Sequence, residues 1–142
     1  MNIDSTVRTG IVIDHITAGR AMRLYELLGL EHSDGSVALI KNVSSEKMGK
    51  KDIIKIETEQ PLDLDIIGYV DPGATVNVIR DGKLIEKKLI TCPHELRDVI
   101  RCKNPRCITS VEQELPHVFR LTDKDNRIYR CIYCETAASQ KK

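Results

Sequence analysis

The sequence predicts an α+β protein, in which a ferredoxin-like antiparallel sheet with two helices is followed by a small zinc-ribbon-like β domain. Three observations predict this fold. Short runs rich in Ile and Val alternate with two helical segments through the first 91 residues. Pro93 interrupts this pattern, because proline disfavours the continuation of a strand or helix. Four cysteines in two close pairs then follow. The predicted domains are therefore residues 1–91 and 92–142.

The first domain is predicted to contain two short helices and a series of strands. Residues 18–28 have apolar side chains at helical spacing, with Thr17 as the predicted cap and Gly29 as the stop signal. A second helix is predicted within residues 61–69, and a hairpin turn at residues 80–83. The predicted strands are residues 10–16, 36–43, 52–57, 74–79 and 84–89.

These elements run strand, helix, strand, strand, helix, strand, with one further strand. That order is typical of a split βαβ sheet extended by a hairpin. Helices on one face of such a sheet would bury a hydrophobic core for about 90 residues without help from a metal.

The second domain is predicted to consist of short strands around the cysteines. Alternating apolar and polar residues predict strands at 98–101, 117–121 and 127–130. About 50 residues are too few for a self-sufficient hydrophobic core, so we expect a bound metal to supply much of the folding free energy.

The four paired cysteines predict a structural zinc site with one Zn²⁺ per chain. Cys102 and Cys107 form a C-x4-C pair, and Cys131 and Cys134 form a C-x2-C pair. Two facing loops of this kind present four thiolates in a tetrahedron, which is the usual ligand set of structural zinc. A closed four-sulfur site leaves no coordination position for water or substrate. Cys92 lies outside both pairs and is predicted to be a free, partly buried thiol.

Composition argues against several other classes of protein. The formal net charge is +1, and the chain has no Trp, four Tyr and one Phe. This leaves neither the basic patch nor the stacking aromatics that nucleic-acid binding requires. No apolar run approaches the ~20 residues that cross a bilayer, and the N-terminus lacks a secretory signal. An odd number of cysteines argues against a complete disulfide framework, so a reducing cytoplasm is expected.

Two alternatives remain open on these patterns alone. A zinc ribbon is also used by nucleic-acid-binding and transcription-associated modules. A small zinc enzyme or redox protein would need an open ligand position or a reactive thiol pair, and a closed four-thiolate site offers neither.

Four runs of sequence together resemble the regulatory chain of aspartate carbamoyltransferase. They are GIVIDHI at 10–16, MGKKDIIKIE at 48–57, PGATVNVI at 72–79, and the two cysteine pairs with their neighbours at 102–108 and 131–135. The set covers nearly the whole chain in the order in which the family has it.

The resemblance implies a non-catalytic regulatory subunit of an enzyme of pyrimidine biosynthesis. Residues 1–91 would be a nucleotide-binding allosteric domain for CTP and ATP, with UTP assisting CTP. Residues 92–142 would be the zinc domain that contacts the catalytic chain. The partners implied are this catalytic chain and a second regulatory chain, with no nucleic acid and no membrane.

The resemblance also implies the residues of the nucleotide site. Asp14 would contact the sugar, His15 would lie near the phosphates, and Lys55 would lie under the ribose and base. An acid can accept hydrogen bonds from ribose hydroxyls, and ammonium groups offset phosphate charge. The chain has no glycine-rich phosphate loop, so phosphate affinity must come from side chains. The whole implied set is Thr6, Val12, Asp14, His15, Lys51, Lys55, Asn77, Ile79, Leu84 and Lys87.

Asn104 and Glu112 match positions that contact the catalytic chain in the family. Two residues depart from the family pattern: Gly82 stands where an aromatic residue is often found, and Thr136 stands where some relatives have lysine. Without the resemblance, Asp14, His15 and Lys55 would be interpreted as solvent-facing residues of a strand. Asn104 and Glu112 would be interpreted as ordinary polar loop residues.

Overall fold

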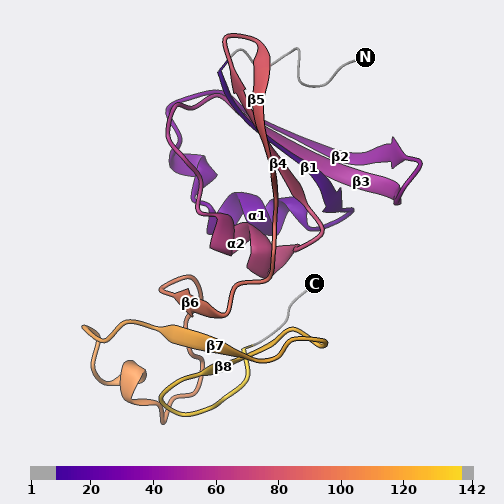
Figure 1. The fold of residues 1–142 in the computed structure, drawn as a ribbon. Coiled ribbons are helices and arrows are strands. Elements are labelled where there is room, and N and C mark those ends of the chain that lie inside the picture. The colour runs from indigo at the N-terminus through magenta and orange to yellow at the C-terminus, as the bar shows by residue number, and fades with distance from the viewer. Residues whose placement is uncertain (1–8, 139–142) are drawn as a thin grey trace. The chain divides into compact units, whose positions relative to one another are not determined.

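The chain divides into two compact units, Met1–Thr91 and Cys92–Lys142 (Figure 1). The structure is a computed structural model, and it describes residues 9–138.

The first unit is a five-stranded antiparallel sheet with two short helices. The sheet order is β2-β3-β1-β4-β5, so the first strand lies at the centre. This confirms the predicted fold class of a ferredoxin-like sheet extended by a hairpin. The elements are β1 Gly10–Thr17, α1 Ala21–Leu27, β2 Val37–Ser45, β3 Gly49–Ile56, α2 Leu64–Val70, β4 Thr75–Arg80 and β5 Lys83–Leu89, with a 3₁₀ turn at Leu30–His32.

The two faces of this sheet have different side chains. Figure 1 shows α1 and α2 side by side on one face, here called the helix face. Ile11, Ile13 and Ile54 point to the helix face and are buried there. The opposite face, here called the far face, carries the alternate residues of each strand, among them Val12 and Asn77. Because neighbouring side chains along a strand point to opposite faces, one strand serves both.

The prediction that Thr17 caps the first helix was wrong. Thr17 is the last residue of β1, and α1 begins at Ala21. The helix start is capped instead by Asp52 of β3, whose Oδ2 accepts hydrogen bonds from the N–H groups of Gly19 (2.9 Å) and Ala21 (3.3 Å). Asp52 is fully buried, and its Oδ1 also accepts the N–H of Asn42 at 3.0 Å. One carboxylate therefore joins the helix start to two strands.

A second buried carboxylate also binds the segment that connects β1 to α1. Asp71 follows α2, and its carboxylate accepts hydrogen bonds from the N–H groups of Thr17 and Gly73. Arg20 lies 3.9 Å from Asp71 and donates to the carbonyl of Val70 at 3.1 Å. The link between β1 and α1 is thus held by groups distant in the sequence.

The hairpin turn has the conformation that its residues predicted. Asp81 and Gly82 have φ values of 52° and 78°, between β4 and β5. Positive φ at both central residues of a two-residue loop is the primed turn that matches strand twist, and glycine adopts it at little cost. Gly82 is therefore suited to this turn whatever relatives carry at the same place.

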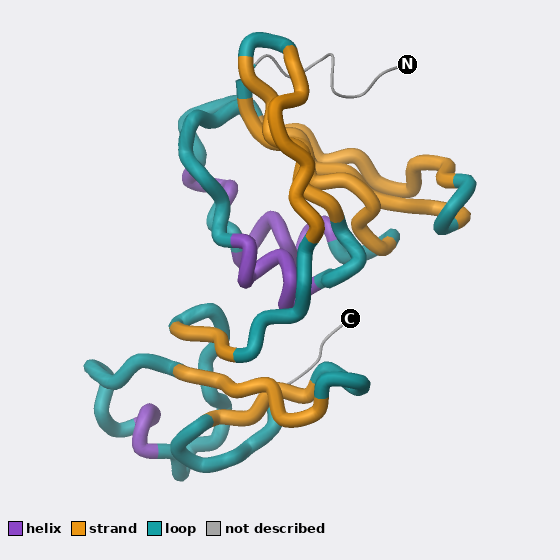
Figure 2. The backbone as a smooth tube through the Cα atoms, viewed as in Figure 1, coloured by secondary structure: helices purple, strands orange, loops and turns teal. Residues whose placement is uncertain are grey.

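The second unit is a three-stranded antiparallel sheet of order β6-β7-β8, with loops making up most of the rest (Figure 2). Its core is small and centres on Leu96, Phe119 and Tyr129, each 1% exposed. The elements are β6 Glu95–Arg97, a 3₁₀ turn at Ile108–Ser110, β7 Val118–Asp123 and β8 Ile128–Cys131.

The predicted strand at 98–101 was wrong, because the strand lies just before it. Asp98 leaves the extended conformation with a φ of 56°, and its carboxylate accepts the N–H of His117 at 2.9 Å. The strand therefore ends at Arg97, and Leu96 pairs with Phe119 in the core. The other two predicted strands are present, shifted by one or two residues at their ends.

The helices are short throughout the described part of the chain. α1 and α2 have seven residues each. No helix within residues 9–138 is long and apolar enough to cross a membrane.

We expect Asp52→Ala to lower the free energy of unfolding of the first unit by about 3 kcal/mol, because three N–H groups lose a buried, charged acceptor. Urea unfolding of the full chain, followed by circular dichroism and assigned by amide hydrogen exchange, measures the change. The exposed Asp34→Ala is the control, with an expected change below about 0.5 kcal/mol. An unchanged urea midpoint for Asp52→Ala would contradict the capping role.

Candidate functional site

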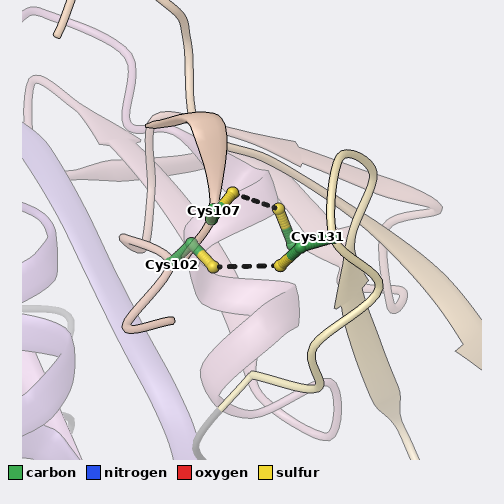
Figure 3. Close-up of side chains that lie close together, drawn as sticks. Cys102, Cys107 and Cys131 are labelled. Atoms are coloured by element: carbon green, nitrogen blue, oxygen red, sulfur yellow. Dashed lines mark hydrogen bonds between the residues drawn. The ribbon is translucent and has the colours of Figure 1, made fainter. Parts of the chain in front are cut away.

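The four cysteine sulfurs of the second unit lie together. All four are within 4.8 Å of one another. The Cys102 and Cys134 sulfurs are 3.5 Å apart, and those of Cys107 and Cys131 are 3.7 Å apart. Figure 3 shows the sulfur of Cys107 facing that of Cys131, which comes from a different segment of the chain. The pairs that the sequence separates are brought to one point by the fold.

This geometry fits a tetrahedral zinc ion. Zn–S bonds of about 2.3 Å in a tetrahedron require sulfurs about 3.8 Å apart. Both measured pairs are close to that separation. The donor set consists of thiol sulfurs alone, which is the ligand chemistry of structural zinc.

Two threonines support the cysteines in matching positions. Thr109 Oγ1 lies 3.1 Å from Cys107 Sγ, and Thr136 Oγ1 lies 3.2 Å from Cys134 Sγ. Each threonine is two residues after its cysteine. Asn104 Nδ2 also donates to Thr136 Oγ1 at 3.2 Å. The C-x-T spacing is visible in the sequence at both sites and is a usable signal for these contacts. Thr136, which stands where some relatives have lysine, thus contacts both Cys134 and Asn104 in this chain.

The thiols of the cluster differ in pKa, and a metal must displace the protons that they hold. Burial raises the pKa of Cys102 to about 12, and burial also raises the pKa of Cys131. The Thr136 hydroxyl lowers the pKa of Cys134 to about 6. Two buried thiols therefore lose their protons only at a cost, which a divalent cation offsets when it binds their thiolates.

The sheet of the first unit gathers polar residues in one row on the far face. Val12 of β1 is directly opposite Lys55 of β3 on one side and Asn77 of β4 on the other. Asn77 is in turn opposite Lys87 of β5. Directly opposed residues of an antiparallel sheet point to the same face, so four strands contribute to this row.

Asp14 of β1 lies on this face by alternation, opposite Thr75, and a bulge adds His15. The register of β1 against β3 shifts between Ile13 and Ile16, and His15 has a φ of 58°. Lys51 Nζ lies 2.9 Å from Asp14 Oδ1, and His15 Nδ1 lies 3.0 Å from Thr75 Oγ1. Lys51 shares a face with Lys55, and Thr75 shares a face with Asn77, since two-residue steps along a strand return to the same side.

One buried polar atom on the far face lacks a partner among the described residues. Asn77 is 7% exposed, and its Oδ1 accepts no hydrogen bond from residues 9–138. A buried acceptor of this kind costs about 1–3 kcal/mol when it stays unpaired. Its position between Val12 and Lys87 in the row makes a bound ligand with a hydrogen-bond donor a natural partner.

The structure brings together every described residue that the resemblance implied for the nucleotide site. Ile79 is two residues beyond Asn77 and is opposite Leu84, which places both on the far face. Thr6 lies outside the described residues. Thr75 was missed, because nothing in its sequence context distinguishes it from other strand threonines. The gathered residues are Val12, Asp14, His15, Lys51, Lys55, Asn77, Ile79, Leu84 and Lys87.

Two protein-family models match this chain, one for each unit. The family model described as "Aspartate carbamoyltransferase regulatory chain, allosteric domain" matches residues 1–91, and the one described as "metal binding domain" of the same chain matches residues 94–142. The chain belongs to the aspartate carbamoyltransferase regulatory chain family. Together the two models span nearly all of the sequence.

Individual members of the family are closely similar. A regulatory chain from Clostridium tetani is 48% identical over 132 residues, covering 92% of both chains. One from Clostridium botulinum strain Hall is 47% identical over 131 residues, covering 92% of this chain and 90% of the relative. One from Bifidobacterium longum is 41% identical over 134 residues, covering 94% and 96% respectively. The resemblance stated from the sequence is confirmed.

The cysteine cluster lies within the metal-binding region of the family. This agrees with the predicted structural zinc. Asn104 lies on the loop between Cys102 and Cys107, and Glu112 lies two residues after the 3₁₀ turn, where its N–H donates to the Ile108 carbonyl at 2.8 Å.

Exposed apolar side chains flank the cluster. Ile108 and Val111 are 50% and 76% exposed, and Ile132 and Tyr133 are each 39% exposed. They belong to the two segments that carry the metal ligands. A metal that fixes these segments also fixes where the apolar side chains stand.

We expect the purified chain to hold one zinc ion, and zinc removal by a chelator to unfold the second unit while the first unit stays folded. Cys134→Ser should have the same effect, because it breaks the four-sulfur site. Metal analysis gives the stoichiometry, and amide hydrogen exchange locates the unfolding. Cys92→Ser is the matched control and should retain zinc. Native protection of residues 118–131 in Cys134→Ser would show that the metal is dispensable for folding.

Proposed function

We propose that this chain is a non-catalytic regulatory subunit that binds CTP and ATP, with UTP assisting CTP, on the far face of the first unit. The observation that carries the proposal is the gathering of three lysines, a histidine and the unpaired Asn77 acceptor on one sheet face. The allosteric-domain match of the same residues supports it.

The chemistry of the far face suits a nucleotide. The ammonium groups of Lys55 and Lys87 offset phosphate charge as point charges. Asn77 Oδ1 is able to accept a hydrogen bond from an amino or hydroxyl group of the ligand. Val12 and Ile79 belong to a buried apolar cluster on the same face, which would lie under a bound base. The residues come from four strands, so the sheet itself sets their spacing.

The second unit is proposed to contact the catalytic chain. Ile108, Val111, Ile132 and Tyr133 supply exposed apolar area, and the polar side chains of Asn104 and Glu112 lie on the same loop. An apolar centre with a polar surround is the usual make-up of a protein interface. Zinc would act here by holding the loops in place, with no part in bond making.

Regulation then requires that the nucleotide bind one quaternary state of the assembly better than another. Coupling of this kind is typically about 1–3 kcal/mol, which changes affinity roughly 5- to 150-fold. The assembly we propose contains the catalytic chain and a dimer of regulatory chains that pair through first-unit sheets. Thiol ligation of zinc also fits the proposed cytoplasmic location.

A pair of adjacent lysines tests the nucleotide site. Lys87 lies on the far face, whereas Lys88 is opposite Val76 and therefore lies on the helix face. We expect Lys87→Ala and Lys55→Ala each to weaken CTP and ATP binding about tenfold, because a charged hydrogen-bond donor to the ligand is lost. Isothermal titration calorimetry of the full chain measures the affinities.

Lys88→Ala removes the same charge from the other face and should leave the affinity within about twofold of the wild type. Equal weakening by Lys87→Ala and Lys88→Ala would place the nucleotide elsewhere. Assembly with the catalytic chain should persist in all three variants. A tight complex of the wild type with a labelled oligonucleotide at physiological salt would favour the nucleic-acid-binding alternative.

An exposed residue of the second unit tests the contact with the catalytic chain. Val111→Asp should abolish or greatly weaken co-purification with catalytic trimers, since it would bury a charge at an apolar contact. Zinc content should not change, because Val111 is 76% exposed and is not a ligand. Leu89→Asp, at a residue 80% exposed in the first unit, is the control. Normal assembly of Val111→Asp would exclude this loop from the interface.

A further inference from the structure

Asp14 is a negative charge placed among the cations of the far face. Lys51 Nζ lies 2.9 Å from its Oδ1, and the two side chains are only 14% and 16% exposed. The same Oδ1 accepts the N–H of His15 at 2.6 Å. A partly buried ion pair of this kind is screened by salt less than an exposed pair.

The carboxylate is held in place by the fold and cannot easily withdraw. The β1 bulge fixes His15 at a φ of 58°, and the His15 ring is anchored to Thr75 at 3.0 Å. The acceptor atom therefore stays next to Lys51 and on the same face as Lys55 and Lys87.

A site whose only charges were lysines would bind any polyphosphate anion. With Asp14 present, an incoming phosphate must compete with a carboxylate for Lys51 and is repelled by it. A ligand that also carries hydroxyl donors offsets this cost, because a carboxylate accepts hydrogen bonds from hydroxyl groups. An inorganic polyphosphate has no sugar hydroxyls to donate to the carboxylate, so nothing of this kind offsets its repulsion by Asp14.

We propose that Asp14 is a specificity-determining residue that makes the site discriminate against inorganic polyphosphates in favour of nucleotides, by competing with phosphate for Lys51. The inference rests on the proposed nucleotide site and adds a repulsive element to it. Specificity commonly needs such an element, since attraction alone favours every ligand of the right charge.

The test is competition between CTP and inorganic tripolyphosphate, measured by calorimetry on the zinc-loaded full chain. We expect Asp14→Asn to tighten tripolyphosphate binding about tenfold, the size of one partly screened charge–charge interaction. The affinity of Asp14→Asn for CTP should rise less than its affinity for tripolyphosphate, or should fall, because the sugar hydroxyls of CTP lose a charged hydrogen-bond acceptor. The ratio of the two affinities is therefore the measured quantity.

A double variant separates the local effect from net charge. Asp14→Asn combined with Lys51→Met removes both partners, leaves the net charge of the wild type, and should return tripolyphosphate affinity to near the wild-type value. Glu86→Gln removes one negative charge on the helix face, where Glu86 lies 4.0 Å from Lys88, and should change neither affinity. With Lys51→Met alone as the fourth member, these variants form a cycle that isolates the coupling between Asp14 and Lys51.

The outcomes distinguish the inference from the proposed function. A tenfold gain in Asp14→Asn that the double variant cancels supports the inference. CTP binding with an unchanged affinity ratio in Asp14→Asn overturns the inference and leaves the nucleotide site standing. An equal gain in Glu86→Gln overturns it as well, because the effect would then be general. Absence of CTP binding in the wild type overturns the proposed site itself.

Discussion

The central position of β1 is the constraint on which the first unit depends. A strand with neighbours on both sides satisfies its backbone hydrogen bonds within the sheet and must divide its side chains between two faces. Ile11 and Ile13 supply the core under the helices, and Val12 supplies the centre of the opposite row. Asp14 follows on the far face by alternation and the bulge adds His15, so one strand contributes to both the core and the candidate site.

Two buried carboxylates hold the connection between the sheet and the first helix. Asp52 and Asp71 accept N–H groups at both ends of the connection from β1 to α1. Asp52 and Lys51 are neighbours on β3, and because of the alternation they serve opposite faces. Helix capping on one side of the sheet and the Asp14–Lys51 ion pair on the other are therefore tied to the same strand. A shift of β3 by one residue would exchange the two roles and disrupt both.

The second unit depends on a different kind of contact. Its apolar core is small, and its loops are long relative to its strands. Metal ligation by four sulfurs supplies stability that the small core does not. Ile108 and Ile132, whose side chains are exposed, each come directly after a cysteine ligand in the sequence. Metal ligation and the presentation of an apolar surface are thus coupled through adjacent residues. The first unit needs no such support, since its sheet and helices bury enough apolar surface.

The fold class, the turn at Asp81 and Gly82, the metal ligands and the family could be predicted from the sequence alone. Each is marked by residues of a particular type at short, regular spacing along the chain. Cysteine pairs, turn glycines and alternating strands are visible within a few residues. Tertiary structure decided the rest. Thr17 was wrongly predicted to be the cap because the side chain that caps the helix start, Asp52, is distant in sequence. In the sequence, Asp52 looks like any charged residue of an alternating strand. The strand at Leu96 was displaced by the conformation of Asp98, which depends on His117. The pairing of Asp14 with Lys51, and the unpaired Asn77, arise only when strands are placed side by side, and no local pattern carries that information.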